Sequence, residues 1–132
     1  MITSAEEFIR LRASFDRAEY SRAAHEAAPM EVWEEVVDRF PEYRRWVAHN
    51  KTVPLEILAR LADDGDEQVR WTVAGKNKLT STLLVKLATD RSEVVRRRIL
   101  HRRHLPIEVV RLLLEDPVEE IRRAAQARVS GE

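Results

Sequence analysis

Residues 53–129 read VPLEILARLADDGDEQVRWTVAGKNK, then LTSTLLVKLATDRSEVVRRRILHRRH, then LPIEVVRLLLEDPVEEIRRAAQARV. Aligned one above another, the three segments share a skeleton with a step of 26 residues, so that Leu58 corresponds to Leu84 and Val110. Four more columns recur in phase: Leu61, Leu87 and Leu113; Asp64, Asp90 and Asp116; Val69, Val95 and Ile121; and Arg70, Arg96 and Arg122. A fixed period of this length predicts stacked units, each too small to bury its own apolar face.

Each segment has the pattern of two short helices joined by a tight turn. In the first, Pro54 opens an apolar helix, Asp63–Asp66 form the turn, and a second helix follows from about Glu67 to Ala74. A degenerate earlier copy keeps Asp38 and Arg44 in the same phase. No stretch alternates with a period of two, so no sheet is expected. The pattern predicts an all-α fold, a short right-handed solenoid of helix pairs.

The N-terminal part of the chain is less regular. Capping-box patterns at Thr3 and Ser4 predict a first helix, and further helices are expected before residue 40. These helices are expected to form an N-terminal cap that covers the open end of the stack with Phe8, Phe15, Tyr20 and Trp33. We therefore expect one domain over residues 1–132, with a helical cap at 1–40 and stacked repeats at 41–129.

Composition narrows the classes of protein. The chain is 44% hydrophobic and 35% charged, with zero formal net charge and no cysteine. Disulfides and cysteine-held metal sites are therefore excluded, and a cytoplasmic location without an export signal or membrane span is expected. Zero net charge argues against general nucleic-acid coating, although residues 79–104 form a basic block with seven Lys and Arg.

The repeats resemble a known family. The runs WVAHNKTVPLEIL at 46–58 and LADDGDEQVR at 61–70 are similar to leucine-rich repeat variant units, a branch of the HEAT-like helical repeats. The resemblance covers about 41–127, and it implies a scaffold that binds other macromolecules rather than an enzyme. Some members carry an iron–sulfur cluster, whose cysteines are missing here, so no cofactor is expected. Small bacterial proteins of this kind can also serve as toxin-immunity proteins or as adaptors.

The recurrent Asp-x5-Arg pair is interpreted as structural. The aspartate lies in the turn before the second helix of each pair, where it can cap backbone N–H groups. The arginine six residues later can reach a turn carboxylate or carbonyl in its own or the adjacent repeat.

The binding hypothesis rests on the next recurrent position, because the stacking of the repeats does not require arginine or tryptophan there. One position after each of those arginines lie Arg45, Trp71, Arg97 and Arg123, and His101 lies four residues after Arg97 on the same helix face. Arginine and tryptophan are enriched at binding hot spots. The sequence therefore predicts a concave surface that binds a protein partner. Its predicted partner-binding residues are Arg45, Trp71, Lys78, Arg97, His101, Arg102 and Arg123.

Two alternatives remain open from the sequence. The first is a nucleic-acid-binding protein related to helical-repeat DNA glycosylases, since the loops after the second helices are basic, and the second is a structural adaptor. His101 and His104 lack a further ligand nearby, so no metal is expected. No phosphate loop or nucleophile motif occurs, so no catalytic residue is predicted.

Overall fold

Capping residues decide where the helices of this chain begin. Side-chain oxygens of Ser4, Asp16, Thr80 and Ser92 accept hydrogen bonds from backbone N–H groups in the first turn of the helix that each precedes.

The computed structural model describes residues 1–131, which contain ten α-helices, one short 3-10 helix and no strand. The elements are α1 (Ala5–Ala13), α2 (Arg17–His25), α3 (Met30–Arg39), η1 (Pro41–Tyr43), α4 (Arg44–His49), α5 (Leu55–Leu61), α6 (Glu67–Ala74), α7 (Ser81–Ala88), α8 (Glu93–Leu100), α9 (Ile107–Leu113) and α10 (Glu119–Val129). The predicted all-α fold is confirmed for this range.

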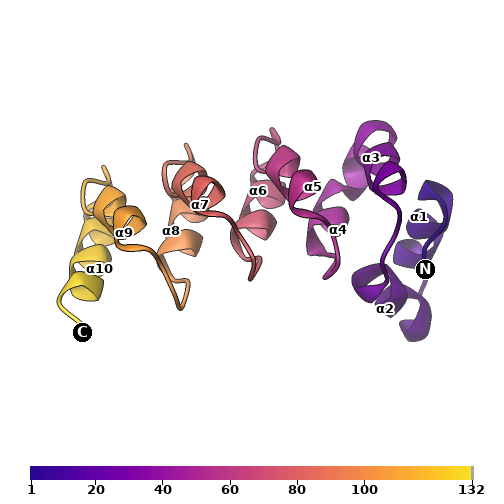
Figure 1. Cartoon of the computed structure of the whole chain (residues 1–132), viewed down its shortest axis with the longest axis horizontal. Helices are drawn as coiled ribbons and strands as arrows, with labels where there is room; N and C mark the ends of the chain where they lie inside the picture. The colour runs from indigo at the N-terminus through magenta and orange to yellow at the C-terminus, as the bar shows by residue number, and fades with distance from the viewer. Residues whose placement is uncertain (132) are drawn as a thin grey trace. The chain divides into compact units, whose positions relative to one another are not determined.

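The chain divides into two compact units, and each is described by itself. Unit 1 is Met1–Asp64 and unit 2 begins at Gly65. Figure 1 shows α1–α5 in unit 1 and α6–α10 in unit 2. Within residues 1–131, no helix combines the length and the apolar character needed to cross a membrane.

Unit 1 is built around two aromatic side chains. Phe8 of α1 and Trp33 of α3 are fully buried and meet edge to face, with ring centres 5.3 Å apart. Phe15, which we expected to contribute to a cap, is fully exposed between α1 and α2. A buried Asn50 fastens the end of α2, because its Nδ2 donates to the carbonyls of Ala23 and Glu26 at 2.9 Å each.

Unit 2 consists of two rows of helices. In one row α6 packs against α8 and α8 against α10, and in the other α7 packs against α9 (Figure 1). Apolar residues at helical spacing, such as Val69 and Val73 in α6 or Val95 and Ile99 in α8, face the space between the rows and are buried.

The Asp-x5-Arg column joins successive turns of unit 2. Nε of Arg70 donates to Asp90 at 2.9 Å, and Nε of Arg96 donates to Asp116 at 2.7 Å. Nη2 of each arginine bonds the second oxygen of the same aspartate, at 3.2 and 3.3 Å, so both pairs are bidentate. Both pairs are buried. Each arginine therefore pairs with the aspartate of the following turn, which agrees with the structural interpretation.

The aspartates bond backbone N–H groups that precede the helix, whereas the capping prediction placed these bonds in the first turn of the helix. Asp90 accepts the backbone N–H of Ser92 at 2.9 Å, and Asp116 accepts that of Val118 at the same distance. Ser92 itself, rather than Asp90, is the N-cap of α8. The carboxylate therefore shapes the turn; α8 is capped by the side chain of Ser92, whereas the N-cap residue of α10, Val118, provides no side-chain cap.

Two further arginines of unit 2 brace backbone carbonyls. Nη1 of Arg102 donates to the carbonyls of Ala74 at 2.9 Å and Lys76 at 2.6 Å. Arg128 repeats this arrangement 26 positions later, with Nη1 3.0 Å from the Leu100 carbonyl and 2.7 Å from that of Arg102. These arginine side chains thus connect the C-terminal end of α6 to that of α8, and the C-terminal end of α8 to that of α10.

Candidate functional site

Six of the seven predicted partner-binding residues belong to unit 2. The seventh, Arg45, lies in α4 of unit 1, where it is exposed and its guanidinium carbon is 4.7 Å from the centre of the Trp46 ring. The prediction that Arg45 shares one surface with the other six stays a prediction. The site is therefore built from the side chains of unit 2.

A hollow of about 830 Å³ opens beside α6 and α8, and we call it the Trp71 hollow. Four of the predicted residues line it together, and two, Lys78 and Arg123, do not. No carboxylate is among its lining residues, which are Trp71, Ala74, Gly75, Asn77, Val94, Arg97, Arg98, His101, Arg102, Arg103 and His104. Its wall is thus aromatic and apolar on α6 and mainly cationic on α8 and the loop that follows.

Trp71 is the aromatic centre of the hollow. Its position in α6 faces away from the core filled by Val69 and Val73, and its side chain remains 42% exposed. The guanidinium carbon of Arg98 lies 3.4 Å from the centre of its ring. This is a cation–π contact, which is worth roughly 0.5–1 kcal/mol at an exposed site. The indole therefore holds a cation in place beside the hollow.

Arg98 is the least satisfied cation of this surface. Its Nη1 is buried without a hydrogen-bond partner, and within residues 1–131 its guanidinium forms no recorded ion pair. Burial, reinforced by the nearby charge of Arg102, lowers the pKa of Arg98 from its usual value. An arginine still remains protonated near neutral pH. The result is a partly desolvated positive charge that an anion in the hollow would stabilise.

Gly75 makes this arrangement possible. A Cβ built at Gly75 would overlap the guanidinium of Arg98, whereas the backbone of Gly75 has a φ of −90° that any residue can adopt. Glycine is therefore needed here for space and not for conformation. In the sequence, Gly75 takes the position that His49 and His101 occupy in the neighbouring repeats. A glycine in a column of histidines was the available sign that another side chain packs closely against this helix.

The predicted arginine stripe is already paired with glutamates. Arg97 donates to Glu93 at 3.3 Å and to Glu120 at 3.0 Å, and these contacts, first with Glu120, raise the pKa of Arg97. Arg123 donates to Glu119 at 2.9 Å and is largely exposed. Both are surface pairs, which contribute little stability but offset the positive charge of the stripe.

The other predicted residues differ in how far they are engaged. The guanidinium of Arg102 is committed to backbone carbonyls, and burial lowers its pKa, so it supports the wall of the hollow. His101 lies at the end of α8, exposed and facing the hollow. Lys78 is exposed in the loop before α7 and outside the hollow. Of the residues that line the hollow, sequence reasoning named Trp71, Arg97, His101 and Arg102 but did not name Arg98.

The chemistry of the Trp71 hollow is that of an anion-binding surface. A guanidinium fixed on an indole, beside imidazoles and a carbonyl-braced arginine, can hold a carboxylate or phosphate oxygen. Across residues 1–131, no three histidine, cysteine, aspartate or glutamate side chains are grouped as metal ligands. Comparison of the chain with models of protein families, with curated proteins and with solved structures gives no match.

Proposed function

We propose that this chain is a non-enzymatic binding protein that holds an acidic segment of a protein partner in the Trp71 hollow. One observation carries the proposal. A half-exposed tryptophan and an unpaired, partly buried arginine share a hollow with no carboxylate in its wall. Tryptophan and arginine are the residues most enriched at interface hot spots, and an unpaired arginine gains most when a carboxylate binds it.

The roles of the residues follow from their contacts. Trp71 acts as the desolvated anchor and holds Arg98, and Arg98 receives the carboxylate. Arg97 and His101 form the rim, where the glutamates paired with Arg97 exclude a partner whose acidic groups are badly placed. Lys78, Arg45 and Arg123 lie outside the hollow, and in the proposal they only steer the approach of an acidic partner.

The proposal includes a finer description of the fold. Within unit 2, the helix pairs are proposed to stack as HEAT-like repeats of the leucine-rich repeat variant kind, in a right-handed solenoid. Support comes from contacts that recur after 26 residues, such as the carbonyl braces of Arg102 and Arg128 and the pairs formed by Arg70 and Arg96. A cytoplasmic immunity protein or adaptor is the concrete form of this function that the family resemblance favours.

A nuclease-treated pull-down from the native cell tests the proposal, followed by titration of the purified partner. Trp71→Ala is expected to abolish capture, whereas Phe15→Ala removes a fully exposed aromatic side chain outside the hollow and should leave capture intact. For the purified partner, loss of a hot-spot tryptophan is expected to weaken binding by about 30-fold or more. Equal capture by both variants would remove the Trp71 hollow from the function.

Nucleic-acid binding is the second candidate, favoured by the same carboxylate-free wall. It is disfavoured by Glu93, Glu119 and Glu120, which neutralise the flanking arginines and would repel a phosphate backbone. Retention on DNA at low salt, lost steeply as salt rises and lost in Arg98→Glu, would favour this candidate over a protein partner. If the protein ignores DNA at low salt, this candidate is excluded.

A further inference from the structure

Unit 1 has a hollow of its own, which we call the Trp46 hollow. It measures about 460 Å³ and lies between α1, α2 and α4. Arg17, Tyr20 and Ala24 line it from α2, where they recur at the spacing of a single helix face. Arg12 of α1 and Trp46 and His49 of α4 line it from the other helices. Like the Trp71 hollow, it has no carboxylate among its lining residues.

Arg12 is stacked and unpaired in the same way as Arg98. Its guanidinium carbon lies 3.5 Å from the centre of the Trp46 ring, and its Nε is buried without a hydrogen-bond partner. In the described part of the chain, no hydrogen bond or ion pair is recorded for its side chain. Trp46 also contacts Arg45, so the indole ring is in contact with two guanidinium groups. Its role in the hollow is therefore to orient cations, and not to stack on a ring of a ligand.

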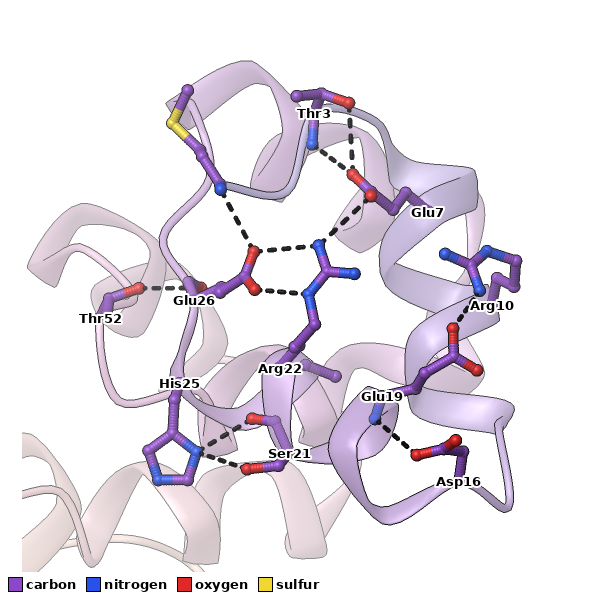
Figure 2. Close-up of polar contacts among 12 residues, drawn as sticks. Thr3, Glu7, Arg10, Asp16, Glu19, Ser21, Arg22, His25, Glu26 and Thr52 are labelled. Carbon is purple, nitrogen blue, oxygen red and sulfur yellow. Dashed lines mark hydrogen bonds and ion pairs between the residues drawn. The ribbon is translucent and has the colours of Figure 1, made fainter.

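The carboxylates of α1 and α2 are engaged elsewhere, as Figure 2 shows. Glu26 and Glu7 bind Arg22, and Glu19 binds Arg10. Glu19 and Arg22 of α2 and its C-cap residue Glu26 follow one stripe, separate from the stripe that lines the hollow. At the hollow, His25 donates from Nδ1 to the Ser21 carbonyl at 2.9 Å. The local acids therefore neutralise Arg10 and Arg22 and leave Arg12 without a partner.

We propose that the Trp46 hollow is a second oxyanion site, which receives a carboxylate side chain from an acidic peptide segment. Arg12 supplies the donors, held in position by the indole, and the exposed Arg17 supplies a second cation at the rim. Two cations and a small aromatic hollow match a monoanionic carboxylate, which one guanidinium can bind in a bidentate manner. The proposal does not depend on the Trp71 hollow, because it concerns different residues in the other unit.

The three tryptophans make the test direct, because each indole N–H gives its own signal in a ¹H–¹⁵N NMR spectrum. Trp46 reports on the Trp46 hollow, Trp71 on the Trp71 hollow, and the fully buried Trp33 on the core of unit 1. A capped tetraglutamate peptide, added to the full chain at constant ionic strength, is expected to shift the Trp46 signal saturably. A capped tetraglutamine peptide should leave it unchanged.

A pair of variants on α1 decides whether Arg12 is the receptor. Arg12→Met should weaken the response of the Trp46 signal at least tenfold, while Arg10→Met, which removes an exposed arginine paired with Glu19, should not. An unchanged Trp33 signal shows that each variant is folded. The proposal is overturned if the peptide leaves Trp46 unmoved, if Arg12→Met binds like the parent, or if inorganic phosphate binds there and the peptide does not. Failure of the Trp71 hollow alone would appear only in the Trp71 signal.

Discussion

Arg96 and Arg98 stand two residues apart on α8, and the two sides of that helix place them in opposite situations. On the turn side, Arg96 donates to both oxygens of Asp116 and, through Nη1, to the Asp90 carbonyl at 2.7 Å. On the side of the Trp71 hollow, Arg98 has an indole against one face and a buried nitrogen with no partner. The difference separates an arginine whose donors are used within the fold from one whose donors remain for a ligand.

Unit 1 gives the same contrast with different elements. Arg22 is shared between Glu7 and Glu26, whereas Arg12 has only the Trp46 ring. In both units the unpaired arginine lies against a tryptophan and lines a hollow without carboxylates. The surroundings of each arginine, rather than the residue type, therefore decide which ones are candidates for binding.

The largest expected effect comes from breaking a buried pair on the turn side. Asp116→Ala leaves the guanidinium of Arg96 buried without its carboxylate and also removes the acceptor for the Val118 N–H. Loss of one partner of a buried ion pair typically costs about 3–5 kcal/mol, so the free energy of unfolding should fall by that amount. Chemical denaturation followed by circular dichroism measures it.

A surface pair provides the control for Asp116→Ala. Glu119→Ala removes the partner of the exposed Arg123 and should change the free energy of unfolding by less than about 1 kcal/mol. If the two variants lose similar stability, the buried pairs are no more important to the fold than the surface pairs.

A smaller effect is expected on the other side of α8. Arg98→Met loses a cation–π contact of roughly 0.5–1 kcal/mol, but it also removes an unpaired buried nitrogen that costs about 1–3 kcal/mol. The free energy of unfolding should therefore stay within about 1 kcal/mol of the parent or rise slightly, while partner binding weakens. In the matched variant Arg96→Met, the free energy of unfolding should fall by about 3–5 kcal/mol. Similar losses in both variants would contradict the contrast between the two arginines.

Gly75→Ala should alter the hollow and little else. The added methyl group overlaps the Arg98 guanidinium, so the side chain must leave the Trp71 ring, while the backbone accepts alanine without strain. We expect a shifted Trp71 indole N–H signal, faster quenching of its fluorescence by acrylamide, and a stability change below about 1 kcal/mol. Gly65→Ala is the matched control, because nothing lies within 4 Å of the added methyl group. If the Trp71 signal stays in place, Arg98 does not depend on Gly75.

The sequence was most informative where contacts recur with its period. The helices of unit 2 and the structural role of Arg70 and Arg96 could be predicted, because their apolar and charged columns return every 26 residues. The same periodicity identified Trp71 as an exception. It could not identify Arg98, because the cation that stacks on Trp71 comes from the neighbouring helix α8 and belongs to a different column.

The Trp46 hollow could not be predicted from the sequence. Its arginine comes from α1, before the periodic part of the chain, and Arg12 reaches Trp46 only because α1 and α4 both pack against α2 and α3. Phe15 shows the opposite error, since an aromatic residue expected to cover a core is instead fully exposed. Tertiary contacts without a period therefore set both the second hollow and the departure from the predicted cap.

The smallest expected effect concerns Glu26, whose half-buried partner Arg22 is also bound by Glu7 (Figure 2). The hydrogen bond from Arg22 is the main cause that lowers the pKa of Glu26 from 4.5 to about 2. Since the folded pKa is the lower one, this carboxylate stabilises the fold above about pH 4.5, and the contribution is lost as the pH falls toward 2. Glu26→Gln should therefore reduce the acid dependence of the melting temperature between those pH values, whereas Glu115→Gln, at an exposed position without a recorded ion pair within residues 1–131, should not. Identical acid profiles for the parent and Glu26→Gln would show that the ion pair between Glu26 and Arg22 adds nothing to stability.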